Sequence, residues 1–224
     1  MMDLTRLRAK LELGLQQLAE QSDRPEVFEG ARSNHTVERL LAWLALLVKW
    51  NRAYNLTAVR DPDEMVVRHL LDCLAVLPHI EAGELLDVGA GPGLPGAVLA
   101  IARPDLSVTL VDSNLKMTRF AELAALELKL DNLRVHRSRV EALEGPDYRQ
   151  IISRAFASLD KFLMLAGSLC APGGRMLAMK GRCDQQELAA IRPPWQPESI
   201  LPLTVPFQEG QRHLVIIRRN GEQS

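Results

Sequence analysis

The sequence predicts an α/β protein built on a mostly parallel, doubly wound sheet, with a helical extension at the N-terminus. From Leu85 onward, short apolar segments alternate with amphipathic ones, which is the pattern of βαβ units. Before that point the apolar residues recur at helical spacing only. We therefore expect a helical extension over residues 1–80 and a sheet domain over residues 81–224.

The N-terminal part is expected to form three helices. Leucines recur at helical spacing over Leu4–Leu18, and a second apolar helix over Thr36–Trp50 has Thr36 as its expected N-cap. A third helix is expected over Asp61–Leu77, with Asp61 as its cap followed by a proline at the first helical position. His69 and Asp72 lie three residues apart on it, where an acid–base pair is one alternative and an ordinary surface pair is the favoured interpretation.

The sheet domain is expected to hold seven strands and four helices. The strands are predicted at Leu85–Val88, Val108–Asp112, Leu133–His136, Arg149–Ser153, Gly174–Lys180, Ile200–Val205 and His213–Arg218. The helices are predicted at Gly96–Ala102, Lys116–Leu128, Leu159–Cys170 and Asp184–Ile191. No helix is expected between the last two strands, so they should pair antiparallel. Ligands collect at the carboxyl ends of parallel strands.

Composition excludes several classes of protein. The chain of 224 residues has a formal net charge of −1, so any nucleic-acid-binding surface must be local. The 3 cysteines and 5 histidines lack metal-ligand spacing, so no metal is expected. No run of apolar residues is long enough to span a membrane and no secretory leader is evident, which predicts a cytoplasmic protein.

The glycine-rich stretch after the first strand is the strongest single signal. It runs Asp87-Val88-Gly89-Ala90-Gly91-Pro92-Gly93-Leu94-Pro95-Gly96 and leads into an apolar helix. Glycines at such a turn permit positive φ and let a ligand approach the backbone. Asp112, at the end of the second strand, has the spacing of an acid that accepts hydrogen bonds from ribose hydroxyls.

Two nucleoside cofactors fit this pattern. Because Gly91 to Gly96 spell G-x-G-x-x-G, a nicotinamide-dependent dehydrogenase is one alternative. However, the carboxylate of Asp87 would repel a pyrophosphate, and Pro92 and Pro95 lack the amide donors that a phosphate needs. A carboxylate suits an ammonium group instead, which favours S-adenosyl-L-methionine.

The order of several further segments resembles one family. From about Val37 onward, the chain is similar to the bacterial small-subunit ribosomal RNA guanine-N7 methyltransferases, also called glucose-inhibited division protein B. The segments that carry the resemblance are Trp50–Asn51, Tyr54–Arg60, His69–Asp72, Leu86–Gly96, Ser138–Glu141, Ile152–Leu159 and Met179–Gly181.

The resemblance implies a fold, a reaction and a set of contacts. The fold would be a Rossmann-like class I methyltransferase, and the product 7-methylguanosine in a conserved loop of 16S ribosomal RNA near the decoding site. The small ribosomal subunit would be the partner. Separately from the resemblance, a monomer is expected. Together with the residues chosen from the glycine turn and from spacing, the expected cofactor contacts are Asp87, Gly89, Gly91, Leu94, Asp112, Val140, Glu141 and Arg154. For Arg154, recognition of the guanine and structural pairing with an Asp or Glu are the open alternatives.

The chemistry of N7 methylation agrees with the absence of an obvious acid–base pair. Guanine N7 carries an in-plane lone pair and no proton, so no general base is required. No catalytic residue is therefore assigned. Phe156 is expected either to stack on the base or to be packed as a structural ring, and phosphate contacts are expected at Lys161, Lys180, Arg182, Arg119 and Arg68. A ribosome assembly factor that binds RNA without catalysis is the second alternative.

Overall fold

The computed structural model describes residues 2–145, 147–154, 156 and 158–220. Its centre is one seven-stranded sheet with the strand order β3-β2-β1-β4-β5-β7-β6. The strands are β1 (Gly83–Val88), β2 (Leu106–Asp112), β3 (Leu133–Arg137), β4 (Tyr148–Ser153), β5 (Cys170–Lys180), β6 (Trp195–Pro202) and β7 (His213–Arg219). The first five are parallel, whereas β7 pairs antiparallel with β5 and β6, which confirms the predicted C-terminal hairpin.

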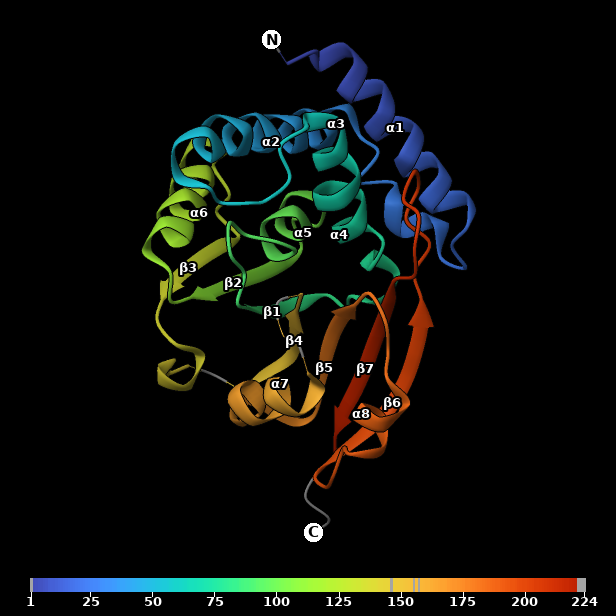
Figure 1. Cartoon of the computed structure of the whole chain (residues 1–224), viewed down its shortest axis with the longest axis vertical. Helices are drawn as coiled ribbons and strands as arrows, with labels where there is room; N and C mark the ends of the chain where they lie inside the picture. Colours follow the sequence, from blue (N-terminus) through green and yellow to red (C-terminus); the bar gives the residue numbers. More distant parts are fainter. Residues whose placement is uncertain (1, 146, 155, 157, 221–224) are drawn as a thin grey trace.

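Helices cover both faces of this sheet (Figure 1). On one face lie α1 (Leu4–Glu20), α2 (Asn34–Tyr54), α5 (Gly96–Ala102) and α6 (Leu115–Glu127), and on the other lie α7 (Leu159–Ala166) and α8 (Gln185–Ala189). Short 3₁₀ turns occupy Pro25–Phe28, Leu77–His79, Val140–Ala142 and Gly167–Leu169. The predicted doubly wound α/β architecture is therefore confirmed.

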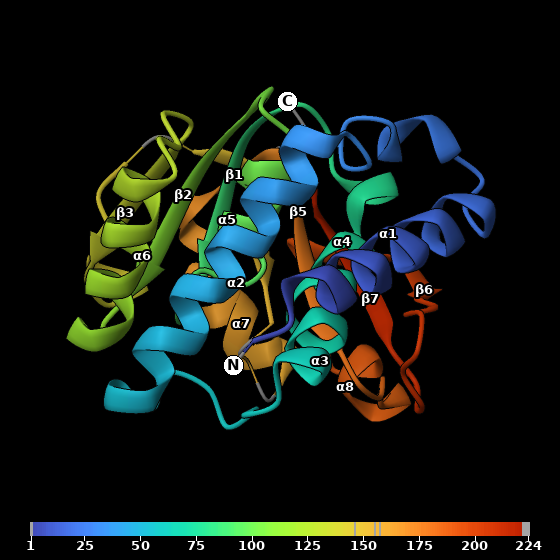
Figure 2. The ribbon, with the colours of Figure 1, turned by 90° about the horizontal axis from the view of Figure 1, so that it is seen from above.

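Each face of the sheet has its own hydrophobic cluster. The larger one joins the N-terminal helices to the sheet, with Leu44 of α2 and Leu99 of α5 both fully buried in it. From above, α2 crosses over α5 while α1 lies beside it (Figure 2). The smaller cluster is centred on Phe162 of α7. The predicted boundary between residues 1–80 and 81–224 stays a prediction, since one core spans both segments.

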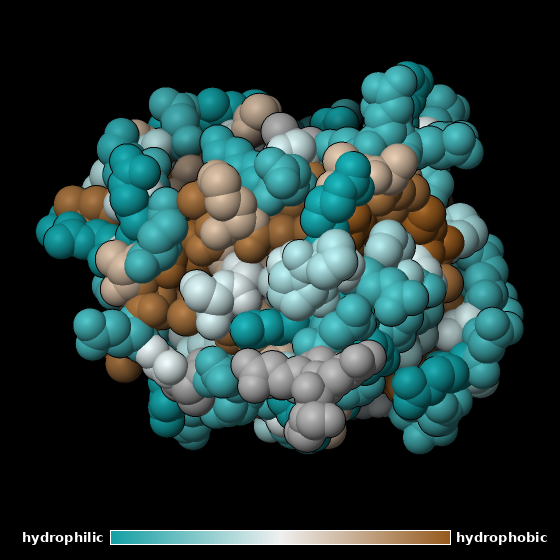
Figure 3. All heavy atoms as spheres, turned by 90° about the horizontal axis from the view of Figure 1, so that it is seen from below, coloured by the Kyte–Doolittle hydropathy of each residue, from teal (hydrophilic) through white to brown (hydrophobic). Residues whose placement is uncertain are grey.

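The face that carries α7 and α8 has apolar residues at its surface (Figure 3). Seen from below, it shows a band of hydrophobic residues between polar ones (Figure 3). Met164 of α7 is 68% exposed. This face lies on the far side of the sheet from the N-terminal helices.

The second helix begins earlier than predicted. Its N-cap is Ser33, whose side chain accepts a hydrogen bond from the backbone N–H of Thr36. The expectation that Thr36 is the cap was wrong, because Ser33 has the same capping chemistry and lies one turn upstream. The buried Thr36 hydroxyl is instead within hydrogen-bonding distance of Ser33 Oγ, at 2.9 Å.

The third helix is capped as predicted but is not a regular α-helix. Asp61 accepts a hydrogen bond from the N–H of Asp63, and α3 (Pro62–Met65) follows. A π-helical turn over Val66–Leu71 then leads into α4 (Asp72–Leu74). A π turn inserts one residue into a helix and is frequent at functional sites. No glycine or proline lies within it, so the sequence gives no local signal for it.

Candidate functional site

The turn between β1 and α5 has the backbone shape that its glycines predict. Gly89, Gly91 and Gly93 have φ values of 68°, 55° and 103°. These values lie in the region that glycine adopts without steric cost. The N–H of Gly89 donates to the carbonyl of Val111 at 2.9 Å, which fixes the turn to the end of β2.

Asp87 holds the first turn of α5 in place. Its Oδ2 accepts a 2.7 Å hydrogen bond from the N–H of Gly96, and its side chain is fully buried. The N-terminus of α5 therefore already has a hydrogen-bond acceptor, in the position where a dinucleotide-binding fold holds a pyrophosphate. Since Pro95 has no N–H to offer, this turn is poorly suited to a phosphate ligand.

The protonation of Asp87 is set by its surroundings. Burial raises its pKa to about 7, while the hydrogen bond from Gly96 and the charge of Arg154 act in the opposite direction. Its Oδ1 has no hydrogen-bond partner among the described residues. The side chain packs against the start of α5 rather than standing at the mouth of the turn. A contact between Asp87 and an ammonium group stays a prediction.

Asp112 lies at the carboxyl end of β2 and faces the glycine turn. Its Oδ2 accepts from the N–H of Gly91 at 2.9 Å, and its Oδ1 accepts from the N–H of Asn114 at 2.8 Å. Each carboxylate oxygen has a second lone pair, so both can accept further hydrogen bonds. A Cβ placed on Gly91 would meet no atom within 4 Å, so the space above this part of the turn is open.

A cavity of about 290 Å³ lies at the carboxyl ends of β1 and β2 and beside the segment after β3. Four of the predicted cofactor residues line it, namely Gly89, Asp112, Val140 and Glu141. The open turn and the acidic rim fit an adenosine with ribose hydroxyls as donors. The cavity accordingly fits the nucleoside part of S-adenosyl-L-methionine.

Other predicted cofactor residues lie elsewhere. Leu94 is buried in the larger core, and its N–H donates to the carbonyl of Ala90 at 2.8 Å. Arg154 lies against a different pocket, described below. The segment after β4 also includes Ala155 and Ala157, which lie outside the described residues.

Several residues that line the cavity were not predicted as cofactor contacts. Ser138 and Arg139 directly precede Val140 and belong to the segment Ser138–Glu141 that carries the resemblance, but only its last two residues were chosen as contacts. Lys161, expected at a phosphate, also lines the cavity. The ring of Phe156 stacks on Phe162 with centroids 5.1 Å apart. This packing favours a structural role for the ring over stacking on the target base.

A second pocket, of about 330 Å³, lies at the carboxyl ends of β4 and β5. Asp72 is buried beside it and accepts two hydrogen bonds of 3.1 Å, one from Nη1 of Arg154 and one from Nε of Arg212. Arg154 Nη1 also donates to the carbonyl of Arg68 at 2.9 Å. One carboxylate thus joins the N-terminal helices to two separate segments of the sheet domain.

The expectation of a surface pair between His69 and Asp72 was therefore wrong. Both side chains are buried, and each has a partner outside this pair. His69 Nε2 lies 3.0 Å from Thr57 Oγ1. Burial, with a contribution from the charge of Arg154, lowers the pKa of His69 to about 4. The imidazole is thus neutral at physiological pH.

The basic residues expected to contact phosphate are distributed over the molecule. Arg68 and Lys180 line the second pocket. Lys180 is ion-paired with Glu187 of α8. Arg182 lies in a shallow hollow before α8, and Arg119 is exposed on α6.

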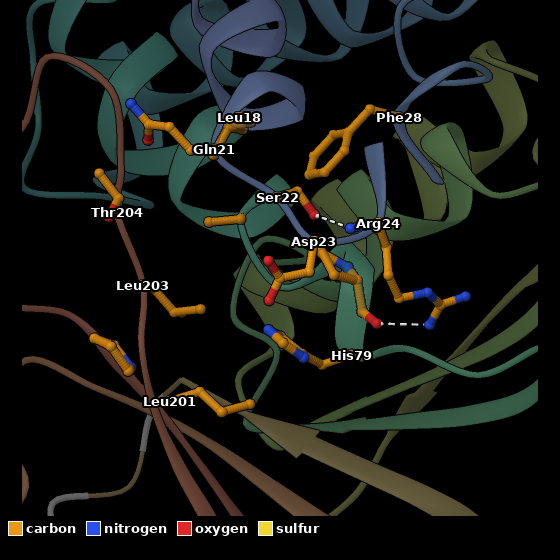
Figure 4. Close-up of a pocket in the computed structure, with 13 residues that line it drawn as sticks. Leu18, Gln21, Ser22, Asp23, Arg24, Phe28, His79, Leu201, Leu203 and Thr204 are labelled. Atoms are coloured by element: carbon orange, nitrogen blue, oxygen red, sulfur yellow. Dashed lines mark hydrogen bonds between the residues drawn. The ribbon is translucent and has the colours of Figure 1, made fainter. Parts of the chain in front are cut away.

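A further pocket separates the end of α1 from the C-terminal hairpin (Figure 4). Its volume is about 380 Å³, and Asp23, Arg24 and His79 line it together with apolar residues. Arg24 Nη1 donates to the carbonyl of Pro78 at 2.9 Å, so this pocket belongs to the junction between the N-terminal helices and the sheet. No residue predicted as functional lies in it.

The described residues hold neither a metal-binding cluster nor a membrane span. Within residues 2–145, 147–154, 156 and 158–220, no group of three or more His, Cys, Asp or Glu side chains is placed to hold a metal ion. In the same part of the chain, no helix has both the length and the apolar character needed to cross a membrane.

Comparison with known proteins identifies close relatives. The family model described as "rRNA small subunit methyltransferase G" matches residues 36–215. A protein of Methylobacillus flagellatus named ribosomal RNA small subunit methyltransferase G is 48% identical over 212 residues, covering 94% of this chain and 98% of its own. A protein of the same name from Pseudomonas paraeruginosa is 52% identical over 208 residues, covering 92% and 95%.

Solved structures share the fold at low identity. A methyltransferase from Pyrococcus furiosus matches with a TM-score of 0.57 and 16% identity, covering 82% of this chain and 97% of its own. An O-methyltransferase from Bacillus cereus, solved in complex with SAH, matches with a TM-score of 0.54 and 16% identity, covering 80% and 91%. The family match and the relatives from Methylobacillus flagellatus and Pseudomonas paraeruginosa give no support to the dehydrogenase or the non-catalytic assembly factor.

Proposed function

The chain belongs to the family of small-subunit ribosomal RNA methyltransferases G, and from this membership we propose that it methylates N7 of one guanine in 16S ribosomal RNA with S-adenosyl-L-methionine. The guanine N7 lone pair would attack the methyl carbon in line with the breaking bond to sulfur. The sulfur keeps the bonding electron pair, and S-adenosylhomocysteine leaves. The target loop near the decoding site is part of the same proposal.

The observation that carries the cofactor assignment is that two carboxyl groups beside the glycine turn have different roles. Asp87 fills the N-terminus of α5, where a pyrophosphate would otherwise bind. Asp112 lies at the rim of the open cavity and keeps acceptor capacity for ribose hydroxyls. This arrangement favours a cofactor with a nucleoside and no phosphate.

The protein's part in such a reaction is positioning. In-line transfer needs the nucleophile and the methyl carbon held at near-contact distance, and N7 needs no base. The neutral His69 and the paired Asp72 agree with a site that moves no proton. The proposed cofactor contacts remain Gly89, Gly91, Leu94, Asp112, Val140, Glu141 and Asp87. Arg154, expected with them, lies against the second pocket and pairs with Asp72.

The proposal is tested by methyl transfer to small ribosomal subunits from cells that lack this protein. Labelled S-adenosyl-L-methionine is expected to place label in 7-methylguanosine at one loop of 16S ribosomal RNA. Cofactor binding without label in RNA would support an assembly factor and contradict the proposal. Gly89→Val is expected to abolish cofactor binding in a folded protein, because Gly89 lines the cavity and a valine would strain a turn whose backbone has a φ of 68°.

We also propose a cytoplasmic, monomeric enzyme. The enzyme would have to be cytoplasmic to reach an RNA substrate that is assembled in the cytoplasm. Sedimentation of the purified chain tests the second, and a stable dimer would contradict it.

A further inference from the structure

The second pocket is assembled from three distant parts of the chain. Asp72 comes from the N-terminal helices, Arg154 follows β4, and Arg212 precedes β7. Their contacts converge on one carboxylate that is only 3% exposed. Because the carboxylate has two oxygens and each receives one guanidinium, the two arginines are held side by side.

The pocket carries an excess of positive charge. Its lining includes Arg68, Arg154, Lys180 and Arg212, and Asp72 is the only acidic residue among the described residues that line it. Even with Lys180 paired to Glu187, the cations exceed the anions. An anionic ligand is therefore the complement of this pocket.

The pocket is well placed for an extended substrate. Lys180 ends β5 and pairs in register with His213 of β7, while the glycine-turn cavity lies at the ends of β1 and β2 of the same sheet. Both sites therefore open at the carboxyl edge of the strands. A nucleic acid lying along this edge would reach both.

We propose that the second pocket binds a phosphodiester group of the RNA substrate, and that Asp72 is a positioning residue that preorganises Arg154 and Arg212 for it. This inference rests on the proposed function. The pocket holds one backbone phosphate while the target base reaches the methyl donor in the neighbouring cavity. Arg68, exposed at the rim, provides a direct contact to the same phosphate.

The test measures methylation of small ribosomal subunits as a function of subunit concentration and salt. Arg68→Gln is expected to raise KM by about three- to tenfold at physiological salt without changing kcat. It should also reduce the slope of log KM against log salt by about 0.7, the value for one phosphate contact in single-stranded RNA. Arg218→Gln is the matched control, since Arg218 pairs with Glu198 and lies on β7 at the opposite edge of the sheet.

Asp72 is tested by a pair of variants. Asp72→Asn removes the charge and is expected to raise KM more than Arg68→Gln does, whereas Asp72→Glu restores the charge and should recover part of the salt slope. A residue with a merely structural role would change stability without changing this slope. If the Asp72 variants do not fold, the salt slope of Arg68→Gln alone tests whether the pocket binds a phosphate.

Two results would overturn the inference. The first is a salt slope for Arg68→Gln that equals those of the wild type and of Arg218→Gln. The second is a loss of affinity for S-adenosylhomocysteine in Arg68→Gln, which would assign the pocket to the carboxylate of the cofactor. Failure of the proposed function is distinguishable, because the wild-type protein itself would then place no label in RNA, whereas salt-dependent RNA binding can still be compared between the variants.

Discussion

Asp87→Asn is expected to change how the stability of the protein depends on pH. The carboxyl is fully buried, and burial raises its pKa from 3.8 to about 7. Between these values, the native carboxyl keeps a proton that the unfolded chain has released. The free energy of unfolding of the wild type therefore falls as pH rises through this range. The amide of the variant does not titrate, so the variant lacks this loss.

The size of the effect follows from the pKa shift. Each pH unit inside the range lowers the free energy of unfolding by at most about 1.4 kcal/mol. From 3.8 to about 7 this amounts to about 4 kcal/mol. The asparagine carbonyl can still accept from the N–H of Gly96, so the first turn of α5 keeps its anchor. The free energy of unfolding of the variant, relative to that of the wild type, is thus expected to rise steadily as pH rises between these two values.

Urea denaturation at a series of pH values measures this difference. Tryptophan fluorescence follows unfolding, because Trp43 is fully buried in the larger core. Leu126→Gln is the control, since Leu126 is 76% exposed and carries no charge, and its stability should differ from that of the wild type by a constant. A difference between Asp87→Asn and the wild type that does not change with pH would refute the argument that Asp87 is protonated by burial.

Three further results are expected. Gly96→Ala should lower the free energy of unfolding by about 1–3 kcal/mol in thermal or urea denaturation, because the added Cβ would lie 2.3 Å from Leu110 Cδ2 and 2.8 Å from Asp87 Oδ2; an unchanged stability would contradict this packing. The pKa of His69 is lowered from 6.5 to about 4, so protonation of this ring disfavours the native state. The free energy of unfolding of the wild type should therefore fall by up to about 3 kcal/mol as pH falls through this range, and that of His69→Gln should not show this decrease. If Asp87 meets the ammonium group of the cofactor, calorimetric binding of S-adenosylhomocysteine near pH 7 should release a proton, seen as a heat that depends on the ionisation enthalpy of the buffer; equal heats in two buffers would remove Asp87 from the cofactor contacts.

The strands of the sheet were predictable because the residues that specify each strand are close together in the sequence. Apolar strands, glycine turns and amphipathic helices alternate along the chain, and each strand was placed with at least part of its observed range. The extra residues lie at the ends, as in β6, which begins at Trp195 rather than Ile200. Its early part includes Pro197 at an irregularity in the ladder, and a proline weakens the expectation of a strand.

The glycine-turn cavity was predictable for a similar reason. Gly89, Asp112, Val140 and Glu141 follow successive parallel strands, and the topology of a parallel sheet brings such positions together. The orientation of Asp87 was not predictable. Whether a carboxylate faces a ligand or the neighbouring helix depends on packing, and a 2.7 Å bond to Gly96 is invisible in the spacing.

The second pocket shows the limit of sequence reasoning most clearly. Asp72 and Arg212 are 140 positions apart, and Arg154 lies between them. A pair formed by His69 and Asp72 was expected because helical spacing makes neighbours of residues three apart, yet a tertiary partner with a full charge prevailed over the local one. The negative charge of a buried carboxylate must be balanced by a positive charge, and two guanidinium groups balance it better than a neutral imidazole does. The same requirement makes the cluster informative, because breaking a buried ion pair costs several kcal/mol, so its geometry must be well maintained. An anionic substrate that reaches this pocket therefore meets cations whose positions are already set.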